Sequence, residues 1–152
     1  MKKHLFSILL FVLISCNNKP TYEDYNNHKP MNVSVKGNVT ETLKTVQKLF
    51  NEKNYVLANT HLSRLADFYI DNEEIQLYYG ITFLETDQYP LAKIKFDKLL
   101  LSKNPLFIDE ANWYLALMAL KQNDLETCKS HLVKVSKNSE HYKESKSLLD
   151  KI

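Results

Sequence analysis

Glycine is nearly absent from this chain: only two of its 152 residues, Gly37 and Gly80, are glycines. Loops that cradle phosphate, and the sharp turns that expose a catalytic serine, need clustered glycines for their backbone geometry. The scarcity therefore argues against a nucleotide-binding loop and against a hydrolase nucleophile elbow. Four prolines beside so few glycines also favour an all-helical domain over a turn-rich sheet protein.

Metal-binding and catalytic patterns are missing as well. The five histidines include no pair at the i, i+4 spacing of a helical zinc site, and no Cys-x-x-Cys occurs. The adjacent carboxylates Glu73-Glu74 and Asp109-Glu110 fall at predicted helix starts, where they complement the helix dipole. We therefore expect no enzymatic activity, no metal and no cofactor. A buried, hydrogen-bonded acid–base pair in a pocket would be the observation that favours an enzyme.

No hydrophobic run is long enough to cross a bilayer. The longest, Leu5 to Ile14, follows Lys2 and Lys3, and as a helix it would rise about 15 Å, half of a hydrocarbon core of roughly 30 Å. A basic start and a short apolar run are typical of a secretory signal. The following Leu13-Ile14-Ser15-Cys16 resembles the lipobox of bacterial lipoproteins. The resemblance implies a signal peptide over residues 1–15 and a lipid on Cys16; an ordinary signal followed by a chance cysteine is the alternative.

The chain beyond that signal has no excess of either charge. Two of its 20 basic residues are Lys2 and Lys3, so the rest carries 18 basic and 18 acidic groups. Without a basic field, nucleic-acid binding is not expected. With Cys16 lipidated, Cys128 would be the one remaining cysteine, and on an apolar helical face it is expected to be a small buried side chain.

Residues 16–38 read as a lipidated cysteine followed by a flexible tether. The stretch is polar, contains Pro20, Pro30 and two Asn-Asn pairs, and shows no apolar periodicity. About 22 flexible residues would span on the order of 26 Å. We therefore expect the folded domain, residues 39–152, to stand clear of the lipid headgroups.

From Val39 onward, apolar residues recur at three- and four-residue spacing, and the pattern itself repeats. Four positions return after 34 residues and again after 36, and one shared offset at four positions is improbable by chance. The matching sets are Tyr55, Tyr89 and Leu125; Ala58, Ala92 and Cys128; Leu62, Phe96 and Leu132; and Leu65, Leu99 and Val135.

These positions resemble the tetratricopeptide repeat (TPR), a helix–turn–helix unit of 34 residues. In that family a small residue midway along the first helix lets the two helices of a unit cross closely. Val46, Gly80 and Ala116 hold that place here, and Gly80 needs such a reason, because glycine inside a helix costs around 1 kcal/mol relative to alanine. The resemblance implies an all-α fold: a short solenoid of about three TPR-like units and a C-terminal capping helix. We expect helices near 39–52, 55–70, 73–86, 90–103, 108–122, 125–137 and 141–151.

Stacked TPR units expose their first helices on a concave face, which binds extended peptides in many family members. The resemblance therefore implies a partner-binding groove, apolar with a few polar residues at its edge. An exposed apolar patch of this kind usually marks a partner site, and tryptophan is a favoured anchor. Packing of the same side chains between neighbouring units is the alternative. The residues expected in the groove are Gln47, Phe50, Leu77, Ile81, Leu84, Glu85, Trp113, Leu117, Leu120 and Lys121.

Two functions compete on this evidence. The first is an envelope lipoprotein, anchored to the membrane by its N-terminal lipid, whose groove binds a protein or peptide partner as a non-catalytic adaptor. The second is a structural subunit of a larger envelope complex of the outer-membrane assembly type, using its convex face or terminal helices. Asn17 follows the predicted lipidated cysteine where inner-membrane retention in enterobacteria uses aspartate, which favours the outer membrane. The facing compartment, the partner and the oligomeric state stay open.

Overall fold

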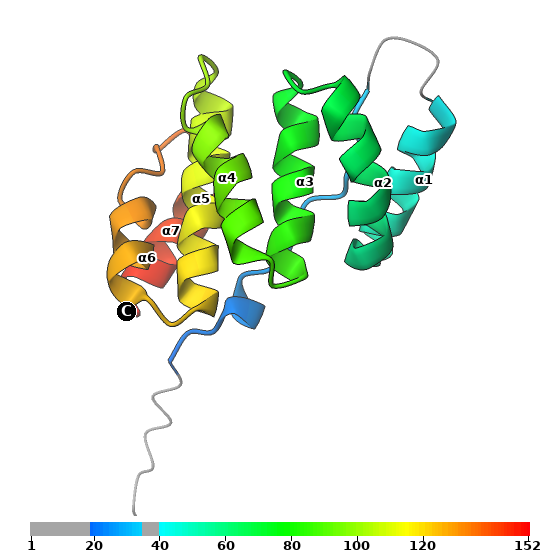
Figure 1. The fold of residues 1–152 in the computed structure, drawn as a ribbon. Coiled ribbons are helices and arrows are strands. Elements are labelled where there is room, and N and C mark those ends of the chain that lie inside the picture. The colour runs from blue at the N-terminus through cyan, green and yellow to red at the C-terminus, as the bar shows by residue number, and fades with distance from the viewer. Residues whose placement is uncertain (1–18, 35–39) are drawn as a thin grey trace, which may run out of the picture.

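The computed structural model describes residues 19–34 and 40–152 (Figure 1). The predicted signal peptide and Cys16 lie outside these residues. Within them the chain forms seven α-helices, one short 3-10 helix and no strand, which confirms the prediction of an all-α fold. The elements are η1 (Tyr22–Asp24), α1 (Thr40–Asn51), α2 (Tyr55–Phe68), α3 (Glu73–Glu85), α4 (Tyr89–Leu99), α5 (Pro105–Lys121), α6 (Leu125–Leu132) and α7 (Tyr142–Leu149).

Each helix from α1 to α6 packs on the next helix along the chain. The connection between α6 and α7 is longer than the others. Helix α3 also packs on α5, and η1 packs on α5. In Figure 1 helices α1 to α6 follow one another in chain order as a slab, and successive ones run in opposite directions; α7 lies between α5 and α6 in this view. None of the helices in the described ranges is both long and apolar enough to span a membrane.

Helix boundaries follow local capping chemistry, and three of them differ from expectation by three residues or more: the end of α4, which is Leu99 instead of residue 103, the start of α5 and the end of α6. Helix α5 begins at Pro105, three residues before the expected start, because proline is tolerated in a first turn and the Asn104 side chain accepts a hydrogen bond from Leu106 N at 3.1 Å. Helix α6 ends at Leu132, five residues early. There Asp109 on α5 accepts hydrogen bonds from Ser136 N at 2.9 Å and Ser136 Oγ at 2.5 Å, which holds the departing chain outside a helix.

The turns that follow α1, α3 and α5 are built alike. Each has one non-glycine residue with positive φ: Lys53 at 60°, Asp87 at 58° and Asn123 at 59°. In each turn the next amide bonds the carbonyl five residues back at 2.8 Å, as in Asn54 N to Leu49 O. This is the Schellman ending of a helix. The residue after the positive φ is also the N-cap of the following helix, so one short motif ends one helix and starts the next.

The repeated apolar positions form the core. Nine of them are buried, namely Ala58, Leu62, Leu65, Ala92, Phe96, Leu99, Cys128, Leu132 and Val135. Gly80 on α3 faces α4 so closely that an added Cβ would lie 2.6 Å from Phe96 Cε1. Close helix packing therefore explains this glycine, although its nearest neighbours are Phe96 and Lys95 rather than the small residue Ala92.

The N-terminal segment is the main departure from expectation. Residues 19–34, predicted as part of a flexible tether, run across the helices in Figure 1 from the end of the slab where α7 finishes to the opposite edge. We call these residues the strap. Tyr22, Met31 and Val33 are buried in the main core, so isolated apolar side chains order a stretch that has no helical periodicity.

Candidate functional site

The residues expected to line a groove come from the first, third and fifth helices and lie along the strap. Their apolar members are not open surface: Phe50, Leu77, Ile81, Leu84, Trp113, Leu117 and Leu120 are all buried. The polar members Gln47, Glu85 and Lys121 are half-buried at the edge, and each of them contacts or adjoins the strap. We use "groove" for this face of α1, α3 and α5.

Tyr22 fixes the N-terminal part of the strap to the helices. Its hydroxyl donates a hydrogen bond to Glu85 Oε1 on α3, and Lys121 Nζ on α5 lies 4.8 Å from the centre of its ring. Lys121 also donates to Leu84 O at 3.2 Å and pairs with Asp87 at 2.8 Å. The C-terminal ends of α3 and α5 thus form a pocket for one aromatic side chain with a hydroxyl.

His28 holds the middle of the strap. Its imidazole Nε2 lies 2.5 Å from the same Glu85 Oε1, and its side chain is 4% exposed. The rings of Phe50, Tyr55 and Tyr114 surround it, with centroids 6.4, 6.0 and 5.6 Å away. Glu85 therefore receives hydrogen bonds from two strap side chains and is the main polar contact between strap and groove.

Hydrogen bonds to the main chain fix the C-terminal part of the strap, Pro30 to Val33. Tyr78 on α3 donates its hydroxyl to Pro30 O at 3.1 Å. On α1, the Asn51 side chain accepts from Met31 N at 2.7 Å and donates to Met31 O at 3.3 Å. Gln47 donates to Val33 O at 2.7 Å. Such contacts to carbonyls and amides recognise an extended backbone, while buried apolar side chains give affinity.

The electrostatics of this contact depend on Glu85. Burial raises the pKa of its carboxyl, but hydrogen bonds from His28 and Tyr22, with the charges of His28 and Lys121, outweigh burial and set the pKa below its ordinary value. Burial and the neighbouring Glu85 carboxylate raise the pKa of Tyr22 far above that of a free tyrosine. The phenol therefore stays a neutral donor, and the carboxylate stays charged.

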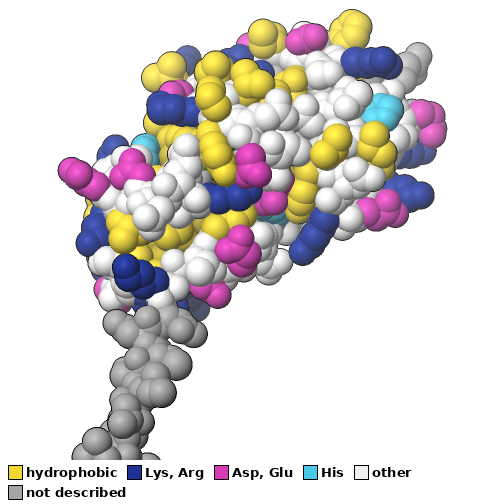
Figure 2. All heavy atoms as spheres, turned by 60° about the horizontal axis from the view of Figure 1, so that its bottom comes forward, with side chains coloured by type: hydrophobic (Ala, Val, Ile, Leu, Met, Phe, Trp, Pro, Cys, Tyr) yellow, Lys and Arg dark blue, Asp and Glu magenta, His cyan; other side chains and the backbone are white. Residues whose placement is uncertain are grey.

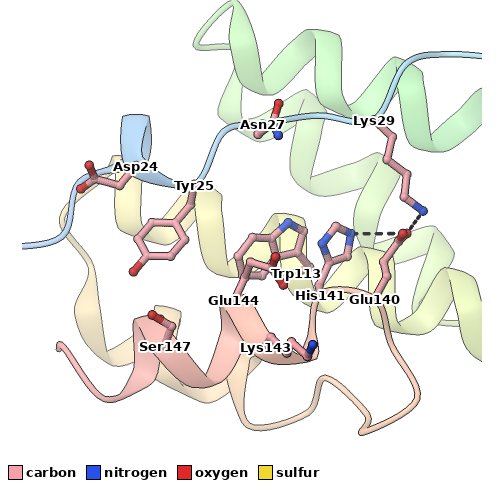
Figure 3. Close-up of a pocket in the computed structure, with 10 residues that line it drawn as sticks. All are labelled: Asp24, Tyr25, Asn27, Lys29, Trp113, Glu140, His141, Lys143, Glu144 and Ser147. Carbon is pink, nitrogen blue, oxygen red and sulfur yellow. Dashed lines mark ion pairs between the residues drawn. The ribbon is translucent and has the colours of Figure 1, made fainter.

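Trp113 lies under the strap and α7 rather than on an open face. It is 3% exposed, the ring of Tyr25 meets it edge-on at 6.3 Å, and His141 stacks on it at 5.0 Å. A cavity of about 550 Å³ separates the strap from α7 beside it. Figure 3 shows Tyr25 and Lys29 reaching into this cavity from the strap, opposite His141 and Glu140.

One group of side chains in this region has the composition of a metal site. Ligand atoms of Glu110, Glu140 and His141 lie within 4.8 Å of one another. Glu140 also forms an ion pair with Lys29 of the strap, drawn in Figure 3. His141 Nε2 is hydrogen-bonded to Glu110 Oε2 at 3.1 Å. Since a lysine already neutralises Glu140, the group is accounted for as an ion-pair cluster that joins the strap to the chain before α7.

Glu85 with His28, and Glu110 with His141, are the buried acid–base pairs that would favour an enzyme. A catalytic pair also needs a nucleophile or a substrate proton within hydrogen-bond reach. Among the described residues, no serine, threonine or cysteine side chain bonds either imidazole ring; Ser139 Oγ accepts only from the main-chain amide of His141, at 3.2 Å. Cys128 is buried, and burial raises the pKa of its thiol to about 11. Both pairs instead connect elements that are distant in sequence.

Part of the groove is open beside the strap. A cavity of about 270 Å³ lies between α3 and α5, walled by Leu77, Ile81, Phe107, Tyr78 and Tyr114. Glu74 and Glu110 line it too, and burial raises the pKa of Glu74. This cavity is the space in the groove that can take a further side chain.

Several residues of the site were not expected from the sequence. They belong to the strap or receive it: Tyr22, His28, Met31, Val33, Asn51, Tyr78, Tyr114 and His141. The available signal was compositional, because a polar tether has no need of Tyr22, Tyr25, Met31 and Val33. Comparison of the chain with protein-family models, with curated proteins and with solved structures finds no match in any of the three.

Proposed function

We propose that this chain is a bacterial envelope lipoprotein, anchored through Cys16, that acts as a non-catalytic adaptor by binding an extended protein segment in a TPR-like groove. The observation that carries the proposal is the strap itself. Residues 19–34, which are irregular or extended apart from η1, lie along the groove with Tyr22, Met31 and Val33 buried and main-chain groups bonded to α1 and α3. A surface that receives its own chain in this way is suited to receive a similar segment of a partner.

The repeat supports the TPR-like part of the proposal. The three matching turns at Lys53, Asp87 and Asn123 fall at the same 34- and 36-residue intervals as the apolar positions. In this arrangement α1–α2, α3–α4 and α5–α6 are the three units and α7 is the cap. The partner's apolar side chains would take the places of Tyr22 and Met31 or enter the open cavity beside Leu77 and Ile81. Each square ångström of apolar surface buried contributes roughly 25 cal/mol before ordering costs.

Partner capture from native membranes tests this proposal. In the chain with Tyr22→Ser and Met31→Ser, the strap loses its two largest buried side chains and the groove is freed. We expect this variant to crosslink more partner than the wild type. Adding Gln47→Ala and Glu85→Ala, which remove polar groups of the groove, should abolish the gain.

Matched control variants separate changes in partner capture caused by the groove from those caused by any surface substitution. Glu23→Ser with Asn32→Ser changes two exposed strap residues, and Glu126→Ala changes an exposed glutamate on α6. Both should behave as wild type. A groove-binding adaptor would be contradicted if three chains captured the same amount of partner: the wild type, the variant with Tyr22→Ser and Met31→Ser, and that variant with Gln47→Ala and Glu85→Ala added. Absence of fatty acid on the purified chain, or its unchanged presence in Cys16→Ala, would contradict the anchor.

A structural subunit of a larger envelope complex is the second candidate, favoured by a separate surface. Phe68, Ile70 and Leu101 are 86%, 57% and 84% exposed, and Ile70 and Leu101 line one cavity of about 250 Å³ at the ends of α2 and α4. Exposed apolar side chains gathered in this way usually mark an interface. If Phe68→Ser with Leu101→Ser abolishes capture and groove variants do not, or if the delipidated chain stays in a large complex, this second function is the correct one.

A further inference from the structure

The strap begins close to Cys16, the proposed site of the lipid. Its first described residue, Lys19, follows Cys16 by only three positions, and Pro20 already packs against the C-terminal end of the fold. Three residues extend at most about 10 Å. A free chain from Cys16 to Thr40 would instead span on the order of 27 Å on average. A packed strap therefore leaves a very short connection where a long flexible one was expected.

The end of the molecule at which the strap begins has a defined composition. A cavity of about 210 Å³ there is lined by Lys19, Pro20, Asn123, Leu125, Lys151 and Ile152. Its walls are the apolar Pro20, Leu125 and Ile152, and the two lysines stand at its rim, exposed. Figure 2, which brings this end of the molecule forward, shows hydrophobic side chains among lysines and carboxylates next to the grey residues.

Two carboxylates near this end are already engaged by the backbone. Asp24 accepts hydrogen bonds from Thr21 N at 2.8 Å and Asp124 from Thr127 N at 3.0 Å. Lys151 donates to Tyr25 at 3.1 Å and lies over its ring, so the basic end of α7 is joined to the strap. Lys19 is exposed at this end, and Lys151 is exposed as well although it donates to Tyr25, so both can meet phosphate beside the apolar side chains.

From this geometry we infer that the end face formed by Lys19, Pro20, Leu125, Lys151 and Ile152 docks on the phospholipid bilayer. The inference rests on the proposed lipid anchor at Cys16 and adds a fixed orientation to it. Headgroup phosphates meet Lys19 and Lys151. The opposite edge, with Phe68 and Leu101, faces away from the membrane at a distance of about the length of α5, whose 17 residues rise about 25 Å.

The orientation depends on the strap staying in the groove. Release of residues 19–34 adds them to the connection, so the domain would gain both reach and rotational freedom. A partner that displaces the strap would therefore also lift the domain from the bilayer. Groove binding and membrane docking then exclude each other.

Quenching by lipid-borne spin labels tests the orientation in the full-length lipidated chain. The chain is reconstituted in liposomes of phosphatidylethanolamine and phosphatidylglycerol that contain a headgroup spin-labelled phospholipid. A fluorophore is attached at Asp150→Cys near the docking face, or at Leu101→Cys on the opposite edge. Native Cys128 does not compete for the label, because it is buried and the pKa of its thiol is raised to about 11.

We expect severalfold stronger quenching at position 150 than at position 101. Tyr22→Ser with Met31→Ser, which frees the strap, should largely remove the difference, whereas Glu23→Ser with Asn32→Ser should preserve it. A chain that floats with the liposomes but is quenched equally at both positions overturns the orientation alone. A chain that carries no fatty acid and does not float overturns the proposed anchor, and the orientation with it.

Discussion

The helices and the strap are ordered by different means. Helices α1 to α6 contact their chain neighbours and bury the same positions in each hairpin, and α2, α3, α5 and α6 each begin at an Asn or Asp side chain that caps a backbone amide. The strap has only one short 3-10 helix and depends on contacts with residues 14 to 63 positions away along the chain, among them Gln47, Asn51, Tyr78 and Glu85. Local rules therefore specify the helices, and the finished groove specifies the strap.

Substitutions in the helical core should therefore destabilise the whole fold, whereas substitutions in the strap should destabilise the strap alone. Phe96 is fully buried between α3, α4 and α5 and stacks on Tyr114 with centroids 5.5 Å apart. Phe96→Ala should lower the free energy of unfolding by about 3–5 kcal/mol, because it removes apolar contacts and leaves a cavity. Urea denaturation measures this effect.

Ile94→Ala is the matched control on the same helix, since Ile94 is exposed. Its effect should stay within about 0.5 kcal/mol. Equal losses in the two variants would mean that α4 does not pack by the face described here.

Met31→Ala should act on the strap alone. The side chain is buried in the groove, and its removal is expected to cost about 2 kcal/mol, the lower end for methionine. We expect the strap to detach while the helices stay folded, so hydrogen exchange should rise at residues 22–33 and stay unchanged in α3 and α5. Asn32→Ala, at the exposed neighbouring position, should leave exchange as in wild type. Faster exchange across all helices would show that the strap is part of one cooperative unit.

Acid should also release the strap before the helices unfold. The pKa of Glu85 is below its ordinary value of 4.5 in the folded chain, so its stabilising contribution is present above that value and is lost as the pH falls through the folded pKa. Trp113 is the single tryptophan and lies under Tyr25, which makes its quenching by acrylamide a reporter of strap release.

We expect quenching in the wild type to increase below about pH 4.5, where Glu85 takes up its proton. Glu85→Gln should show stronger quenching at neutral pH and a flatter response in that acidic window. Glu126→Gln, at an exposed position, should follow the wild-type curve. A Glu85→Gln quenching curve identical to that of the wild type would show that protonation of Glu85 does not release the strap.

The smallest expected effect concerns the repeated turns. Lys53 has a φ of 60°, a conformation that costs a side chain with a Cβ but not glycine. Lys53→Gly should raise the free energy of unfolding by up to about 1 kcal/mol, measured by thermal unfolding. Lys48→Gly, inside α1, should lower it by about the same amount.

Sequence reasoning predicted the helical class, seven helices and the buried repeat positions, because 3.6-residue periodicity and capping are local signals. It located Gln47, Glu85 and Lys121 on one face but left open whether that face is exposed or covered. The strap was missed because Tyr22, His28, Met31 and Val33 have no period, and their burial depends on a groove that exists only after α1, α3 and α5 have packed. The start of α5 was misplaced because Asn104 caps α5 and Pro105 is its first residue, whereas α4 has already ended at Leu99.

The central claim, that residues 19–34 lie in the groove, can be tested most directly by NMR of the full chain in solution. The account predicts heteronuclear relaxation values for residues 22–33 close to those of the helices. It also predicts nuclear Overhauser contacts from the Met31 amide to the Asn51 side chain and from the His28 ring to the ring of Tyr55. Random-coil shifts and fast local motion over residues 22–33, with no contact to α1 or α2, would contradict it.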